Sequence, residues 1–118
     1  MSCKRIVQVA IEEASCRRRF RAYLHPRGCM NARYTHLDIS LESLKGCLLG
    51  ELARRGGYKL KVRALGGGCL MLDPGFGLPS IRLCVQGASL HGDVAYLAMH
   101  KRGVVYLSIQ YRRRRASG

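Results

Sequence analysis

Hydrophobic and polar residues alternate along most of this chain, which is typical of β-strands with one buried face. Residues 4–13 (KRIVQVAIEE) place two valines and Ile11 on one face and polar or small residues on the other. Residues 16–26 (CRRRFRAYLHP) alternate in the same way. We predict that these two segments pair as a hairpin through a turn at EASC. Residues 27–36 show no clear pattern and are interpreted as a loop or an irregular strand.

One segment, residues 38–57, has the spacing of an amphipathic helix. Its leucines recur every three or four positions, Ser40 suits the N-cap, and Gly56 and Gly57 suit the stop. Gly46 and Gly50 lie four residues apart inside it. Because glycine costs about 1 kcal/mol relative to alanine in a helix, we expect this pair to mark the close approach of another backbone.

The rest of the chain predicts strands. Residues 58–65 alternate, residues 66–87 form two strands joined at DPGFG, and residues 93–111 form a hairpin across HKRG. Both faces of VAYLAM, residues 94–99, are apolar. Since one helix cannot cover both faces of such a sheet, we expect a central strand and a homodimer.

The order of elements, roughly ββαβββββ, indicates an α+β fold with one amphipathic helix packed on a mostly antiparallel sheet. The length of 118 residues suits one domain, which we assign to residues 1–111. Continuing the last strand would place Arg113 and Arg115 on its apolar face, where unpaired charge is costly. The strand must therefore end near Tyr111, and residues 112–118 are expected to be a flexible, arginine-rich tail.

Charge points to a polyanionic partner. The chain has 21 basic and 7 acidic residues, a formal charge of +14, and most basic residues fall in three windows without acids: 14–37, 52–72 and 94–118. Arginine predominates, and its planar group suits phosphates and bases. The expected nucleic-acid contacts are Arg17, Arg18, Arg19, Arg21, Arg54, Arg55, Lys59, Lys61, Arg63, Lys101, Arg102, Arg112, Arg113, Arg114 and Arg115. Four tyrosines lie among or beside them and are candidates for stacking on bases: Tyr23, Tyr34, Tyr106 and Tyr111.

The cysteines bear on location. Six are present, an even number that suits disulfides in a secreted chain. The early apolar run IVQVAI is too short for a secretion signal, so we expect a protein of the nucleus and cytoplasm that is not secreted. In such a reducing compartment the thiols are expected to be free, with disulfides as the alternative.

No motif indicates a cofactor or an enzyme. The best metal candidate is Cys16, His25, Cys29 and His36, whose spacing differs from common zinc patterns and leaves zinc binding open. The glycines at 66–68 lack the lysine and hydroxyl of a phosphate-binding loop.

The sequence favours a small basic protein that binds RNA, rather than DNA, through its phosphates with little sequence specificity. A compact basic domain of this kind suits a viral accessory protein that sequesters RNA or counters host defence. A third possibility is a module that binds a host protein and uses the arginine tail for nuclear import, with Ser117 as a possible phosphorylation site.

A ribonuclease is the remaining alternative. Residues 92–114 (GDVAYLAMHKRGVVYLSIQYRRR) loosely resemble the C-terminal hairpin of bacterial ribosome-dependent ribonuclease toxins, without the paired N-terminal helices of that family. The resemblance implies cleavage of RNA. The side chains that suit such chemistry are Arg82, His91, His100, Arg102 and Tyr111.

Overall fold

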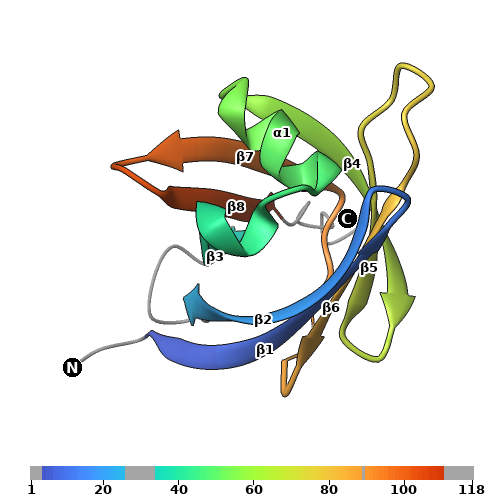
Figure 1. Cartoon of the computed structure of the whole chain (residues 1–118). Helices are drawn as coiled ribbons and strands as arrows, with labels where there is room; N and C mark the ends of the chain where they lie inside the picture. Colours follow the sequence, from blue (N-terminus) through green and yellow to red (C-terminus); the bar gives the residue numbers. More distant parts are fainter. Residues whose placement is uncertain (1–3, 26–33, 89, 111–118) are drawn as a thin grey trace, which may run out of the picture.

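The fold is a closed barrel of eight antiparallel strands (Figure 1). The computed structural model describes residues 4–25, 34–88 and 90–110. Around the barrel the strands follow the order β1-β2-β3-β8-β7-β4-β5-β6. Their bounds are β1 Arg5–Glu13, β2 Cys16–His25, β3 Tyr34–Ser40, β4 Tyr58–Gly66, β5 Cys69–Asp73, β6 Ile81–Gln86, β7 Val94–His100 and β8 Val104–Gln110.

The predicted α+β fold, a sheet covered by one helix, is wrong. Strand β1 pairs with β6, and β3 pairs with β8, so pairings between distant segments close the sheet on itself. Alternation shows that one face of each strand is buried, but it does not show what covers that face. In a barrel the sheet covers its own apolar face, and a covering helix is not needed.

The local pairings agree with the sequence. The hairpin of β1 and β2, the pair β5 and β6 joined through DPGFG, and the hairpin of β7 and β8 are confirmed. Strand β3 lies at the end of the segment that showed no clear pattern. It pairs with β2 through residues near His25 and with β8 along its whole length.

The long helix predicted over residues 38–57 is broken into two pieces. A 3-10 helix, η1, spans Leu41–Leu44, and the α-helix α1 spans Leu48–Arg54. Between them Gly46 has a φ of 81°, which a continuing helix cannot contain. The close approach expected at the glycine pair is confirmed at Gly50, where an added Cβ would lie 2.7 Å from the Leu44 carbonyl oxygen. Neither helix of the described ranges has the length and apolar character needed to cross a membrane.

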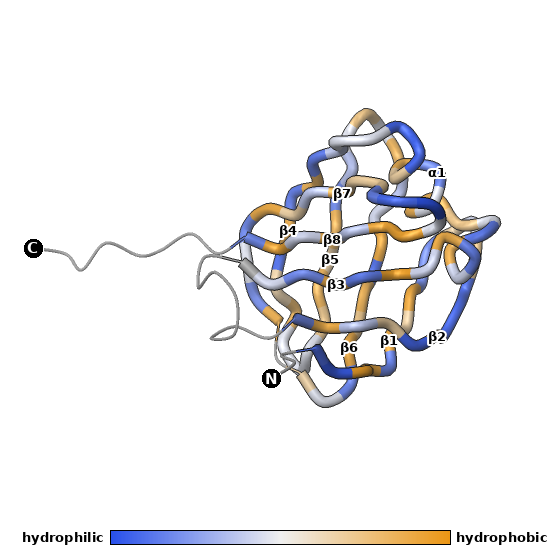
Figure 2. Tube along the Cα trace, turned by 90° about the vertical axis from the view of Figure 1, so that its left-hand side faces the viewer, coloured by the Kyte–Doolittle hydropathy of each residue, from blue (hydrophilic) through white to orange (hydrophobic). Residues whose placement is uncertain are grey.

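Aliphatic side chains fill the barrel, as expected for eight strands. Hydrophobic and hydrophilic residues alternate along much of β8, β3 and β2, whereas the neighbouring β7 is apolar on both faces (Figure 2). The inward residues include Val9, Ile11, Leu37, Ile39, Leu60, Leu70, Leu72, Leu83, Leu97, Val105, Leu107 and Ile109, each at most 1% exposed. Buried leucines of η1 and α1 join the same core.

Two disulfides are present among the described residues, Cys16–Cys47 and Cys69–Cys84. The expectation of free thiols is therefore wrong for these four cysteines, while Cys3 and Cys29 lie outside the described residues. Sequence patterns cannot show which cysteines the fold brings together. Free thiols were expected because the chain was predicted to lie in the nucleus and cytoplasm, and that location stays a prediction.

Candidate nucleic-acid interface

Three of the four histidines gather on the outer surface of one wall of the barrel, formed by β2, β3, β8 and β7. The register aligns His25 with His36, His36 with Ser108, and Asp38 with Tyr106. Figure 2 faces this wall. We call the cluster the histidine wall; its residues are His25, His36, Asp38, His100, Tyr106 and Ser108.

An ion pair lies at the β2–β3 side of the wall. Nε2 of His25 lies 2.8 Å from Oδ2 of Asp38, and the two side chains are only 11% and 14% exposed. Oδ1 of Asp38 is buried and has no hydrogen-bond partner among the described residues. A buried carboxylate oxygen without a donor is costly, and a ligand would reach this atom only after neighbouring side chains moved to expose it.

His36 occupies the middle of the wall. Its Nδ1 lies 2.7 Å from Oγ of Ser108, and its ring meets that of His25 edge to face with centroids 5.9 Å apart. Burial lowers the pKa of His36 below 6.5, and the neighbouring His25 lowers it further. At neutral pH His36 is therefore uncharged, and its ring is a polar surface rather than a cation.

Aromatic rings continue across the wall. The Tyr106 ring lies 5.9 Å from that of His36 and 4.2 Å from that of His100, at 33° to the latter. Tyr23 is 49% exposed on β2, with Nζ of Lys4 located 6.0 Å from its ring centroid. Rings of this kind offer surfaces on which bases stack.

Cations border the wall along β2. Arg17, Arg19 and Arg21 alternate along the outer face of this strand and are exposed. None of them makes a salt bridge with a carboxylate of the described residues. Arg18 lies on the opposite face of β2, and its guanidinium approaches Gly46 between η1 and α1. Three arginines therefore present unneutralised charge along one border.

Strand β4 forms the opposite border. Lys59 is paired in register with Tyr96 of β7, so the outward side chains of β4 adjoin the wall directly. Lys61 and Arg63 follow on the same exposed face. Lys101 and Arg102 occupy the exposed turn that follows His100. The fold thus brings parts of all three basic windows around one surface.

Other predicted contacts lie elsewhere. Arg54 and Arg55 lie at the C-terminal end of α1 and are not on the strands of the wall. The predicted contacts at 112–115, together with Tyr111 and Ser117, lie outside the described residues, as does the side chain of Tyr34.

The two candidate sets for zinc and for ribonuclease chemistry are not assembled. Cys16 and His25 begin and end the ten-residue strand β2, and Cys16 is held in a disulfide. Arg82 lies on β6, which is separated from the wall by β1 on one side and by β5 and β4 on the other. Among the described candidate zinc ligands, the rings of His25 and His36 are in contact.

Sequence reasoning missed the centre of the wall. His25 and His36 were grouped only as candidate zinc ligands, and Asp38 was not placed with them, because only the pairing of β2 with β3 aligns the three. The signal available in the sequence was the alternation along β2. By this alternation His25 lies on the same outward face as Arg19, Arg21 and Tyr23.

A shallow depression of about 580 Å³ lies beyond the β2 border, over β1 and β6. Arg19 is its only charged residue, and the remaining lining is neutral. The depression therefore offers one cation to an anionic ligand, far fewer than the wall and its borders.

Comparison with known proteins finds no match: no family model, curated protein or solved structure is similar to this chain.

Proposed function

We propose that this protein binds RNA across the histidine wall, with the phosphates on the cationic borders and unpaired bases against the rings. The observation that carries the proposal is the arrangement itself. Rings and hydrogen-bonding groups occupy the centre, and exposed cations of β2 and β4 flank it on both sides. Proteins that bind single strands combine a positively charged track with aromatic surfaces in this way.

The borders account for affinity without sequence reading. Arginine holds phosphate oxygens through two parallel hydrogen bonds, and contacts with phosphates are independent of the base. Adjacent strands lie about 4.8 Å apart. The distance between the two borders therefore corresponds to the length of several nucleotides of a single strand. A single strand crossing the wall would meet cations before and after the rings.

Asp38 favours RNA over DNA. Its Oδ1 atom is an acceptor without a donor among the described residues, in the middle of the aromatic surface. The 2′-hydroxyl is a hydrogen-bond donor that RNA has and DNA lacks. A ribose would satisfy this oxygen once the side chains that bury it move aside. Sequestering RNA from host defence, as a viral accessory protein does, remains a prediction beyond binding.

The first experiment compares two single substitutions of equal charge. Arg21→Ala removes a cation at the border, and Arg82→Ala removes one on β6, away from the wall. Binding of a fluorescent single-stranded RNA is measured between roughly 50 and 200 mM salt. We expect Arg21→Ala to reduce the salt slope by about 0.7, because the protein then neutralises one phosphate fewer on the single strand. Arg82→Ala should leave the slope near that of the parent.

A second comparison tests the rings. Tyr106→Leu should weaken RNA binding by roughly 5- to 100-fold, since stacking contributes about 1–3 kcal/mol per base. Tyr106→Phe keeps the ring and should bind as the parent does. Equal effects of Arg21→Ala and Arg82→Ala, or unchanged binding by Tyr106→Leu, would rule out the wall as the interface.

RNA cleavage is a second candidate, favoured by one observation. His36, uncharged at neutral pH, lies beside His25, which is held by Asp38. An imidazole that accepts a proton next to one that donates it is an arrangement able to cleave a phosphodiester. Cleavage of a fluorogenic RNA that is lost in His25→Gln and His36→Gln, but kept in His91→Gln, would support this candidate. Intact RNA after long incubation with the parent protein would exclude it.

A further inference from the structure

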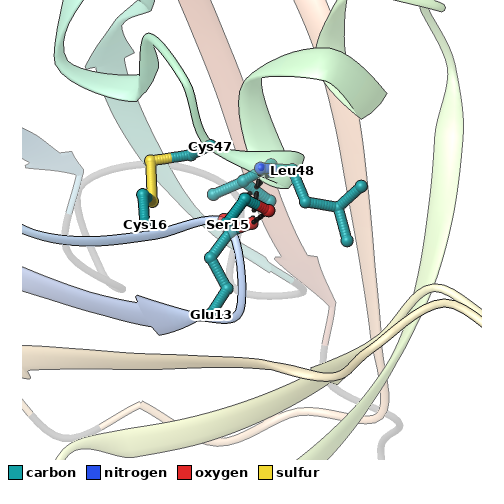
Figure 3. The surroundings of a disulfide bond; sticks show 6 residues. Glu13, Ser15, Cys16, Cys47 and Leu48 are labelled. Carbon is teal, nitrogen blue, oxygen red and sulfur yellow. Dashed lines mark hydrogen bonds between the residues drawn. A yellow bond between two sulfur atoms is a disulfide. The ribbon is translucent and has the colours of Figure 1, made fainter.

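A second cluster of reactive groups lies where the β1–β2 turn meets the start of α1 (Figure 3). Glu13 ends β1, Cys16 begins β2, and Cys47 precedes α1. The carboxylate and the two sulfur atoms lie within 4.8 Å of one another. None of these groups takes part in the proposed RNA surface.

Glu13 is unusual because it is a carboxylate inside the core face of its strand. It continues the inward parity of Val9 and Ile11 and is only 7% exposed. Its Oε2 accepts hydrogen bonds from the Leu48 amide and from the Ser15 hydroxyl at 3.0 Å. Its Oε1 accepts one bond, from the Leu49 amide at 3.1 Å. A carboxylate oxygen has two lone pairs, so Oε1 keeps one for a further partner.

We propose that Glu13, Cys16 and Cys47 form a site for a thiophilic divalent cation, such as Zn²⁺, once the disulfide is reduced. In the disulfide the sulfurs are bonded to each other and are not thiolate ligands. Around a tetrahedral zinc ion, two sulfurs and an oxygen lie about 3.5–3.8 Å apart, given bonds of about 2.3 and 2.1 Å. After reduction the two sulfurs, now 1.99 Å apart, would have to separate to about 3.8 Å by side-chain rotation, while the carboxylate already lies within 4.8 Å of both.

The chemistry balances with a dithiol reductant, such as a small dithiol or a thioredoxin-type protein. The reductant supplies two electrons and two protons, becomes a disulfide itself, and converts the Cys16–Cys47 bond into two thiols. Binding of the cation then releases those two protons, because thiolates are the ligands. Three protein ligands leave the fourth position to water.

The surrounding structure holds the ligands in place without the disulfide. The β1–β2 hairpin is paired along its length, from Arg5 with Leu24 to Glu13 with Cys16. The amides of Leu48 and Leu49 tie Glu13 to the start of α1, which also fixes Cys47. These hydrogen bonds orient the carboxylate, as outer partners do in known metal sites.

The test uses a variant in which the Cys16–Cys47 disulfide is the only one that can form. The cysteines replaced by serine are Cys3, Cys29, Cys69 and Cys84. Cobalt(II), a spectroscopic substitute for zinc, is added to the reduced and to the oxidised protein. We expect a thiolate-to-cobalt charge-transfer band in the reduced protein only, and two protons released per zinc ion.

Substitutions within the same background identify the ligands. Cys47→Ser should abolish the band, and Glu13→Gln should weaken cobalt binding at least tenfold. Glu12→Gln is the matched control, since Glu12 is the exposed neighbour on the opposite face of β1, and it should bind as the parent does. Circular dichroism checks that each variant is folded. For a Glu13→Gln protein that does not fold, Glu13→Asp, which keeps the charge and shortens the reach, takes its place.

The outcomes are distinct. A folded, reduced protein without a charge-transfer band overturns the proposal, as does a band that survives Cys47→Ser. Unchanged affinity in Glu13→Gln removes the carboxylate from the site and overturns the three-ligand assignment. Cobalt binding by the oxidised protein would show that the reduced cysteines are not needed, which also contradicts it.

Discussion

Glu13 and His36 are polar residues that the barrel accommodates by different means. Glu13 points into the core side at the end of a strand, where amides at the start of α1 satisfy its carboxylate. His36 lies on the outer wall, half-buried, and its Nδ1 is within hydrogen-bonding distance of the Ser108 hydroxyl. Glu13 is buried beyond what its residue type favours, whereas half-burial is ordinary for histidine; both lie in the clusters to which we assign chemistry.

His36 should make stability depend on pH. The pKa of His36 is below 6.5 in the folded protein. Between this lowered pKa and pH 6.5, the unfolded chain therefore binds more protons than the folded protein does. Stability then rises with pH: the contribution of His36 is present above about pH 6.5 and is lost as the pH falls toward the folded-state value. The melting temperature of the parent should drop between pH 7.5 and 5.5 by more than that of His36→Gln.

The control for this measurement is His91→Gln, which changes an exposed histidine outside the wall. Its melting temperature should follow that of the parent over the same interval. Parallel pH profiles for the parent and His36→Gln would contradict the prediction.

At the scale of elements, the connection from β3 to β4 is the least regular part of the barrel. It crosses one end through η1 and α1, whose buried residues close the core there. The break between them brings Gly50 against Leu44 and places Cys47 next to Cys16. A continuous helix would provide neither contact.

Gly50→Ala should destabilise the protein although alanine favours helices. The added Cβ would lie 2.7 Å from the Leu44 carbonyl oxygen, which is backbone and cannot turn aside. We expect a loss of about 1–3 kcal/mol, the usual cost of overpacking, in place of the gain of about 1 kcal/mol from helix propensity. Urea unfolding measures the difference.

Glu51→Ala is the matched control because Glu51 is the next residue of α1 and is exposed. It should change stability by less than about 0.5 kcal/mol. A Gly50→Ala protein as stable as the parent would show that η1 and α1 are not packed as described.

At the scale of the molecule, closure of the barrel removes an argument for self-association. The homodimer was expected because one helix cannot cover both faces of an apolar sheet. In the barrel one face of β7 is the core, and the outward side chains of Tyr96 and Ala98 are half-buried by their neighbours. A homodimer therefore stays an untested prediction, which light scattering at high micromolar concentration would decide.

Deleting residues 112–118 tests the prediction that the arginine end is a tail. A continuing strand would place alternate arginines on the apolar face, so we expect the strand to end before them. The melting temperature of the shortened protein should therefore stay nearly unchanged. RNA binding should weaken, and the salt slope should fall by about 0.7 for each phosphate that the shortened protein no longer neutralises. A large drop in melting temperature would show that the arginines belong to the fold. An unchanged salt slope would place the RNA-binding cations entirely on the borders of the wall.

Local patterns in the sequence were sufficient for the hairpins and for the direction of most side chains. Val9 and Ile11 point inward and Arg19 and Arg21 outward because alternation follows from the pleat, whatever the neighbouring strand is. Glu13 lies on the inward face with Val9 and Ile11 but is a carboxylate, and its burial depends on amides 35 and 36 residues away in the chain.

The sequence by itself determined most of the strands, with the exception of β3, and the predominance of positive charge and its separation from the acids, because these depend on residue type and spacing alone. Only the tertiary structure decided that β1 meets β6 and β3 meets β8, which makes the sheet a barrel. The same closure aligned His25 with His36 and brought Cys16 to Cys47. Such contacts join residues far apart in the chain, and their choice depends on how the whole set of strands buries its apolar faces at once, which no local pattern contains.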